Sequence, residues 1–163
     1  EILPKEKALK NIEEYLSSWV KKHMKDYTGI MNFELIDGII IEAHLRFSDM
    51  YMDLFTKPWL QAVINLYQNR VWEFEDHIRG GYAVTLYADH GLTYKKPPLS
   101  LQKDILDDPD VSSLQFPFFE DKCAEYNPMP VGGFRYAQIN GYNLEKLKQY
   151  RDDLYAYLRS CQN

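Results

Sequence analysis

Two apolar runs, 30–36 and 39–45, are separated by Asp37-Gly38 and constrain the fold more than any other part of the sequence. An Asp-Gly pair between two such runs is a strong signal for a tight antiparallel hairpin. Isoleucine-rich strands are usually buried on at least one face, where a carboxylate is costly unless a cation or a hydrogen-bond donor compensates it. This segment nevertheless carries two acids, an imidazole and a guanidinium, which are Glu34, Glu42, His44 and Arg46. We therefore expect the hairpin to form a site.

The register of the hairpin decides which of these side chains meet. Side chains alternate along a strand, so the three candidate residues of the second run point to one face. If the loop has two residues, Glu34 pairs with Ile41 and faces away from Glu42. If the loop has three residues, with Gly38 left-handed in a bulge, the register shifts by one and the two glutamates share a face. The sequence leaves both registers open.

A shared face would make the hairpin a candidate metal site. Two adjacent carboxylates repel unless a cation lies between them, and Mg²⁺ favours such oxygen ligands, usually completed by substrate phosphates. Arg46, two residues beyond His44, would then be placed to neutralise a phosphate oxygen. The alternative is structural, with Glu42 and Arg46 in a surface salt bridge and His44 as a satisfied polar residue.

Apolar residues at helical spacing predict three amphipathic helices. The first covers 4–27. It is followed by Gly29, which we expect in the left-handed conformation common after a helix. The second begins near Thr56 and is about 12 to 15 residues long. Asn143 caps the last helix, at the C-terminal end of the chain.

Further strands are predicted at 82–88, 114–119 and 134–139, the second of them at a sheet edge because it contains a proline. Residues 99–110 are acidic and show little pattern, which indicates a solvated loop. The expected fold class is α+β, with an antiparallel β-sheet packed against amphipathic helices. We expect a helix–hairpin–helix segment at 1–75 and an α+β segment at 76–163, which packs on the same sheet or forms a small second lobe.

Composition excludes several classes of function. The 163 residues are 45% hydrophobic and carry a net charge of −5, which gives no electrostatic footprint for nucleic acid. The sequence has neither a membrane-spanning apolar run nor a signal region. Cys123 and Cys161 lack the spacing of a disulfide framework or a zinc ribbon, so a reduced cytoplasmic location is expected. The chain begins at Glu1, and we expect a fragment or a processed product.

The order of these features resembles the C-terminal lobe of the ATP-grasp superfamily. That family shows an amphipathic helix, a tyrosine-glycine entry, a strand with an acidic residue, a short hairpin and a Glu-x-Asn-x-Arg ending. The corresponding stretches here are Tyr27-Thr28-Gly29 and Ile41-Glu42-Ala43-His44-Leu45-Arg46. The later strands and the closing helix are also similar to the C-terminal domain of biotin carboxylase-like members. The first match spans about residues 7 to 67, and the second rests mainly on the order of elements.

The resemblance implies an ATP-dependent carboxylate ligase, which activates a carboxylate as an acyl phosphate and transfers it to an amine or a similar nucleophile. Glu34 and Glu42 would occupy the magnesium-ligand positions. His44 would replace an asparagine ligand next to the metal and the nucleotide, which would reduce the metal affinity, shift it toward Mn²⁺ or abolish it. Arg46 would bind the ATP phosphates and act in catalysis by stabilising their charge.

The same resemblance implies partners. An N-terminal ATP-grasp half would supply a lysine and a glycine-rich loop for the ATP phosphates, and the substrate would be a small-molecule carboxylate. The chain alone is then expected to be inactive. The alternative hypothesis is a non-catalytic interaction or scaffold module, with homodimer formation through the aromatic helices.

Overall fold

The computed structural model describes residues 10–48, 52–55, 57–75, 80–123 and 133–161. The protein is α+β, with small antiparallel sheets and helices. It divides into two compact units, an N-terminal unit Ile2–Gly80 and a C-terminal unit Gly81–Asn163, which we describe separately. Within the described residues, no helix is both long and apolar enough to cross a membrane.

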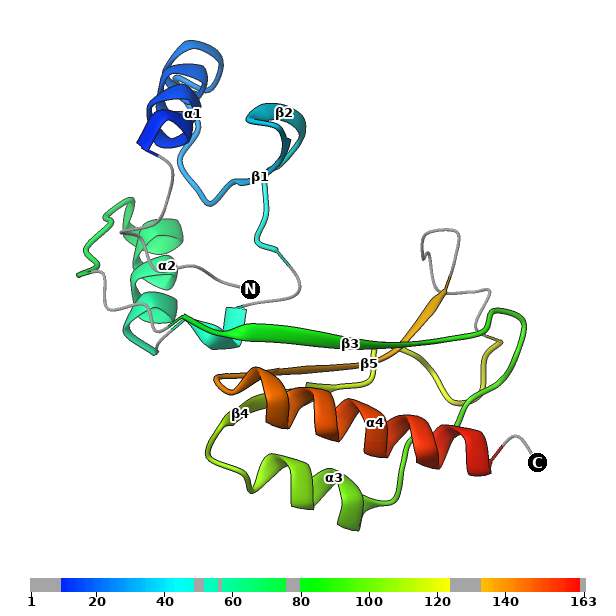
Figure 1. Cartoon of the computed structure of the whole chain (residues 1–163). Helices are drawn as coiled ribbons and strands as arrows, with labels where there is room; N and C mark the ends of the chain where they lie inside the picture. The colour runs from blue at the N-terminus through cyan, green and yellow to red at the C-terminus, as the bar shows by residue number, and fades with distance from the viewer. Residues whose placement is uncertain (1–9, 49–51, 56, 76–79, 124–132, 162–163) are drawn as a thin grey trace. The chain divides into compact units, whose positions relative to one another are not determined.

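The N-terminal unit contains two helices and a hairpin (Figure 1). Its elements in chain order are α1 (Lys10–His23), β1 (Asn32–Ile36), β2 (Ile39–His44), the short 3₁₀ helix η2 (Met52–Leu54) and α2 (Lys57–Asn69). Both predicted helices and the predicted antiparallel strand pair are confirmed, but the first helix ends at His23 and not at residue 27, and α2 has 13 residues. The first part of the helix expected over 4–27 lies outside the described residues.

The segment between α1 and β1 is fixed by two tyrosines. Tyr27 donates its hydroxyl to the carbonyl of Ile30 at 2.9 Å, and the amide of Ile30 donates to the hydroxyl of Tyr67 on α2 at 3.1 Å. A Cβ on Gly29 would lie 2.5 Å from the Tyr27 hydroxyl. The expectation of a left-handed Gly29 is wrong, because its φ lies outside that region, and the glycine instead lies close to the hydroxyls of the two tyrosines.

The C-terminal unit is a three-stranded antiparallel sheet with two helices. In chain order it comprises β3 (Tyr82–Ala88), α3 (Leu99–Leu106), β4 (Val111–Gln115), β5 (Phe134–Gly141) and α4 (Leu144–Ser160). The strand order is β3-β5-β4, so the last strand lies in the middle. Helix α4 contacts β3 and β5, α3 contacts β4, and both helices lie on the same side of the sheet (Figure 1).

The strands of this unit agree with the predictions, but one of its helices lies where the sequence predicts a loop. The strands at 82–88 and 134–139 are confirmed, and the predicted edge strand is an edge strand that starts earlier and ends before Pro117. The loop expected over 99–110 is wrong because it contains α3. A helix this short shows little periodicity in the sequence, and it is held mainly by Ile105, which is fully buried.

Aromatic rings form the centre of this unit's core. The rings of Tyr94 and Phe134 stack with their centroids 5.4 Å apart, and those of Phe118 and Tyr136 stack at 5.3 Å. Two polar residues on β5 are also buried, and the side-chain amide of Gln138 donates to that of Asn140 at 3.2 Å. Because β5 is the middle strand of the sheet, both the aromatic and the polar side chains on it are almost fully buried.

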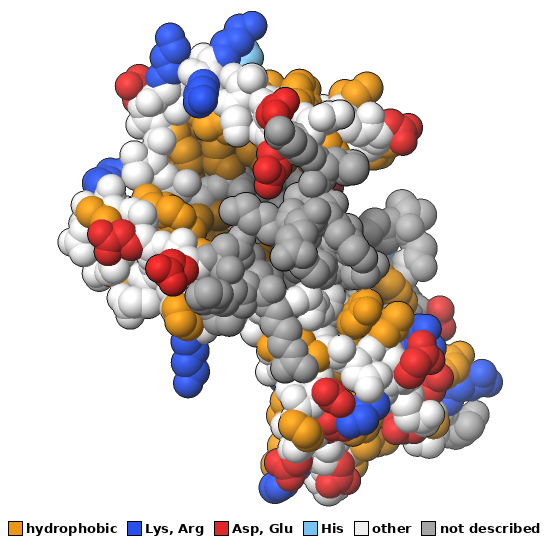
Figure 2. All heavy atoms as spheres, turned by 60° about the vertical axis from the view of Figure 1, so that its left-hand side comes forward, with side chains coloured by type: hydrophobic (Ala, Val, Ile, Leu, Met, Phe, Trp, Pro, Cys, Tyr) orange, Lys and Arg blue, Asp and Glu red, His pale blue; other side chains and the backbone are white. Residues whose placement is uncertain are grey.

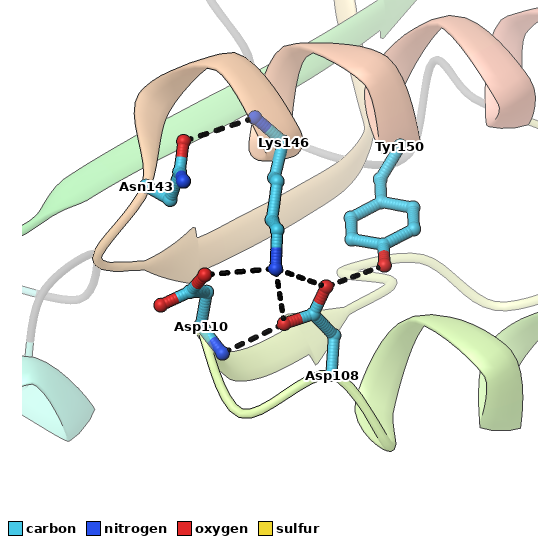
Figure 3. Close-up of polar contacts among 5 residues, drawn as sticks. All are labelled: Asp108, Asp110, Asn143, Lys146 and Tyr150. Atoms are coloured by element: carbon cyan, nitrogen blue, oxygen red, sulfur yellow. Dashed lines mark hydrogen bonds and ion pairs between the residues drawn. The ribbon is translucent and has the colours of Figure 1, made fainter.

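A charged network joins the turn before β4 to the first turns of α4 (Figure 3). The ammonium group of Lys146 lies 3.1 Å from the carboxylate of Asp108 and 2.9 Å from that of Asp110. Asp108 also accepts hydrogen bonds from the Asp110 amide and from the Tyr150 hydroxyl, both at 2.8 Å. Asn143 caps α4 as predicted, accepting from the Lys146 amide at 3.3 Å. These two aspartates therefore belong to the structure's framework and not to a solvated loop.

Asp108 makes the stability of the protein depend on pH. The Asp110 amide, the Tyr150 hydroxyl and Lys146 lower the pKa of Asp108 in the folded state. Its stabilising contribution is therefore present above the unfolded-state value of about 3.9 and is lost as the pH falls through the lower folded-state pKa. We predict that Asp108→Asn lowers the free energy of unfolding at pH 6 and flattens its fall toward pH 3, as measured by urea unfolding across this range.

The exposed Asp104 on α3 provides a matched control, because Asp104→Asn removes the same charge outside the network. This variant should keep the acid dependence of the unaltered protein. An equally steep loss of stability toward acid in Asp108→Asn and in the control would contradict the assignment.

Candidate metal centre

The hairpin turn has two residues. Asp37 and Gly38 both have positive φ angles, 50° and 80°, and the strands pair directly at Ile36 and Ile39. Positive φ at both loop positions is the geometry of a type I′ turn, which matches the right-handed twist of the strands. The three-residue loop is therefore not the one that forms.

A β-bulge nevertheless brings the two glutamates together. Leu35 pairs with Ile40, but Glu34 pairs with Glu42, so Ile41 is the extra residue in β2. A bulge of this kind shifts the register by one residue without changing the turn. The structure thus combines the two-residue loop of one predicted alternative with the shared face of the other.

His44 completes a cluster with the two acids. Its Nε2 atom lies 3.5 Å from Oε1 of Glu34 and 3.2 Å from Oε1 of Glu42. One possible ligand atom from each of the three residues lies within 4.8 Å of the others. The His44 side chain is 20% exposed, whereas those of the glutamates are 52% and 56% exposed. The imidazole is therefore the fixed part of the cluster, and the carboxylates can adjust.

The donor set fits a divalent cation. Carboxylates directly opposite each other on two strands repel, and a single Nε2–H can donate to only one of them. An octahedral ion with bonds of about 2.1 Å needs adjacent ligand atoms about 3 Å apart, close to both distances from His44. Oxygen ligands suit Mg²⁺ and Mn²⁺, and the imidazole nitrogen favours transition metals such as Mn²⁺. Among the described residues, no other group of three potential ligands lies this close together.

Arg46 is not held by the cluster. Its guanidinium donates to the backbone carbonyl of Phe47 at 2.7 Å. The structural alternative of a Glu42–Arg46 salt bridge is also not seen, because Glu42 is paired with His44 instead. Three of the four candidate residues are thus brought together, and the expected role of Arg46 at a phosphate stays a prediction.

A small apolar pocket next to the cluster was not anticipated from the sequence. It has a volume of about 200 Å³, and its lining includes Asn32, Phe47, Phe55 and Trp59. Asn32 is the cross-strand partner of His44, so the pocket and the cluster adjoin along the hairpin. The stacked rings of Phe55 and Trp59, 4.5 Å apart, form one wall. The density of aromatic residues after the hairpin is the sequence signal that could have indicated this pocket.

Comparison with family models, with curated proteins and with solved structures found no match for this chain.

Proposed function

We propose that this chain is the C-terminal part of an ATP-grasp carboxylate ligase, and that its hairpin holds the divalent cation that accompanies ATP. The observation that supports the proposal most directly is the pairing of Glu34 with Glu42 across the hairpin, with His44 in contact with both. When bound, Mg²⁺ or Mn²⁺ would supply charge neutralisation for the phosphates of ATP. The order of helix, hairpin and helix in the N-terminal unit agrees with this family.

In this proposal each residue has a distinct task. The carboxylates of Glu34 and Glu42 balance the charge of the cation, and His44 fixes its position because its side chain is the least exposed of the three. Arg46 exchanges the Phe47 carbonyl for a phosphate oxygen, which gains a charge-assisted hydrogen bond in place of a neutral acceptor. A preceding ATP-grasp half supplies the phosphate-binding lysine and glycine-rich loop, and the substrate is a small carboxylate.

The metal site is tested with Mn²⁺, because the electron paramagnetic resonance signal of the free ion reports binding directly. We expect one Mn²⁺ per chain to bind to the hairpin. Glu34→Gln, Glu42→Gln and His44→Gln should each weaken binding by at least about tenfold, since loss of a direct ligand costs no less than loss of a group that supports one. Mg²⁺ should compete with Mn²⁺ for the same site, and more weakly.

The control is Glu13→Gln, which removes an exposed carboxylate from α1 in the same unit. It should leave Mn²⁺ affinity unchanged. If the control weakens binding as much as the three cluster variants, Mn²⁺ is responding to net charge and the proposed site is wrong.

A second prediction concerns ATP. Because the proposal divides the nucleotide site between two halves, we expect this chain alone to bind Mg²⁺-ATP more weakly than micromolar. Isothermal titration calorimetry of the chain with ATP and saturating Mg²⁺ measures this affinity. Micromolar binding by the chain alone would contradict the division of the site between two halves.

The second candidate function is a non-catalytic interaction module, which exposed apolar residues favour. The hairpin exposes Ile36, Ile39 and Ile41, and α2 exposes Leu60 and Ile64. Figure 2 shows hydrophobic side chains gathered on one face of the N-terminal unit, in the upper part of the view. Patches of this kind mark interaction surfaces. Absence of Mn²⁺ binding together with dimer formation in sedimentation velocity would favour this candidate over the ligase.

A further inference from the structure

A cavity in the C-terminal unit lies between the loop after β3 and the C-terminal end of α4. It has a volume of about 470 Å³, within the range of about 300 to 1,000 Å³ that is usual for small-molecule sites. The loop contributes Asp89, Tyr94 and Lys95, and α4 contributes Tyr157 and Leu158. The loop and the red end of the helix lie next to each other in Figure 1. The cavity belongs to one unit only and contains none of the residues of the metal cluster.

Tyrosine hydroxyls hold the loop in place at three points. Tyr94 donates to the carbonyl of Asp89 and Tyr136 donates to that of Lys95, both at 2.7 Å, while Tyr157 donates to the carbonyl of Lys96 at 3.3 Å. Tyr136 is fully buried, and burial raises its pKa, so its hydroxyl stays a donor at neutral pH. The backbone positions of Asp89 and Lys95 are therefore set before any ligand binds, which lowers the entropic cost of binding.

The cavity combines two opposite charges with an apolar lining. Asp89 and Lys95 are both exposed at its rim, and within the described part of the chain neither side chain takes part in a hydrogen bond or an ion pair. Leu92, Leu158 and the ring of Tyr94 supply the apolar surface. One carboxylate, one ammonium group and an apolar wall match a small molecule that carries the reverse charges on an apolar body.

We propose that this cavity binds a free amino acid with an apolar side chain. Lys95 binds its carboxylate, Asp89 binds its ammonium group, and its side chain lies against the apolar wall. A peptide in the same place offers only one of the two charges at either end, so the free amino acid is the better match. This site is independent of the proposed metal centre, and the two can be tested separately.

The exposed Cys161 provides a reporter, because it lines the same cavity. The assay uses the full chain with Cys123→Ser, so that one thiol remains, and follows its reaction with a thiol-reactive chromogenic disulfide in the presence of a chelator. We expect saturating L-leucine or L-phenylalanine to slow the reaction several-fold. N-acetyl-L-leucine lacks the ammonium charge, and L-leucinamide lacks the carboxylate charge. Each should protect with up to about tenfold lower affinity, because a contact between exposed charges contributes little binding free energy.

Two neighbouring lysines provide a matched pair of variants. Lys95→Met should weaken protection by L-leucine by the same factor as removal of the ligand's carboxylate charge. Lys96→Met should not weaken it, because Lys96 does not line the cavity. Asp89→Asn should weaken protection by L-leucine but not by N-acetyl-L-leucine, which has no ammonium group for Asp89 to bind.

Three results would overturn the proposal. The first is unchanged thiol reactivity with either amino acid up to its solubility limit. The second is equal protection by L-leucine and by the two analogues that lack one charge. The third is equal loss of protection in the two lysine variants, provided that circular dichroism shows both to be folded. Because the chelator removes divalent ions, none of these results depends on the metal centre.

Discussion

The proposed chemistry of this protein depends on one irregularity, the β-bulge at Ile41. Without the bulge, the two-residue turn would place Glu34 opposite Ile41 and would separate the two acids. With it, two carboxylates face each other at a cost that His44 or a cation can offset. Bulges are common where a strand must redirect a side chain to a functional site. A two-stranded hairpin is also only marginally stable on its own. A repulsive pair of carboxylates lowers that stability further, so the pair does not serve to stabilise the hairpin.

The C-terminal unit is organised differently, around a strand whose side chains are covered on both faces. The fold places the last strand in the middle of the sheet, and α4 then packs against β3 and β5. Some charges of this unit belong to its framework, as in the contacts of Lys146 with Asp108 and Asp110. Asp89 and Lys95 stand out against this background, because they flank a cavity and have no charged partner in the described part of the chain.

The sequence predicts the elements of this fold better than it predicts their registers. The Asp37-Gly38 turn, the strands at 82–88 and 134–139 and the Asn143 cap each follow from a local signal, and all are found. Helix α3 is missed because eight residues carry too little periodicity to outweigh an acidic composition. The bulge is missed for a different reason, since it depends on how two strands pair and not on the residues at the turn. The cluster could thus be named from the sequence, but its geometry could not.

Paramagnetic relaxation is the most direct test of whether a divalent ion binds at the bulged hairpin. Substoichiometric Mn²⁺ is added to ¹⁵N-labelled protein, and the loss of each amide signal is followed by nuclear magnetic resonance. The signals of Glu34, Glu42 and His44 are expected to be lost first, together with those of their immediate neighbours. Loss centred on another acidic region of the chain, or uniform loss across all amides, would contradict binding at the hairpin.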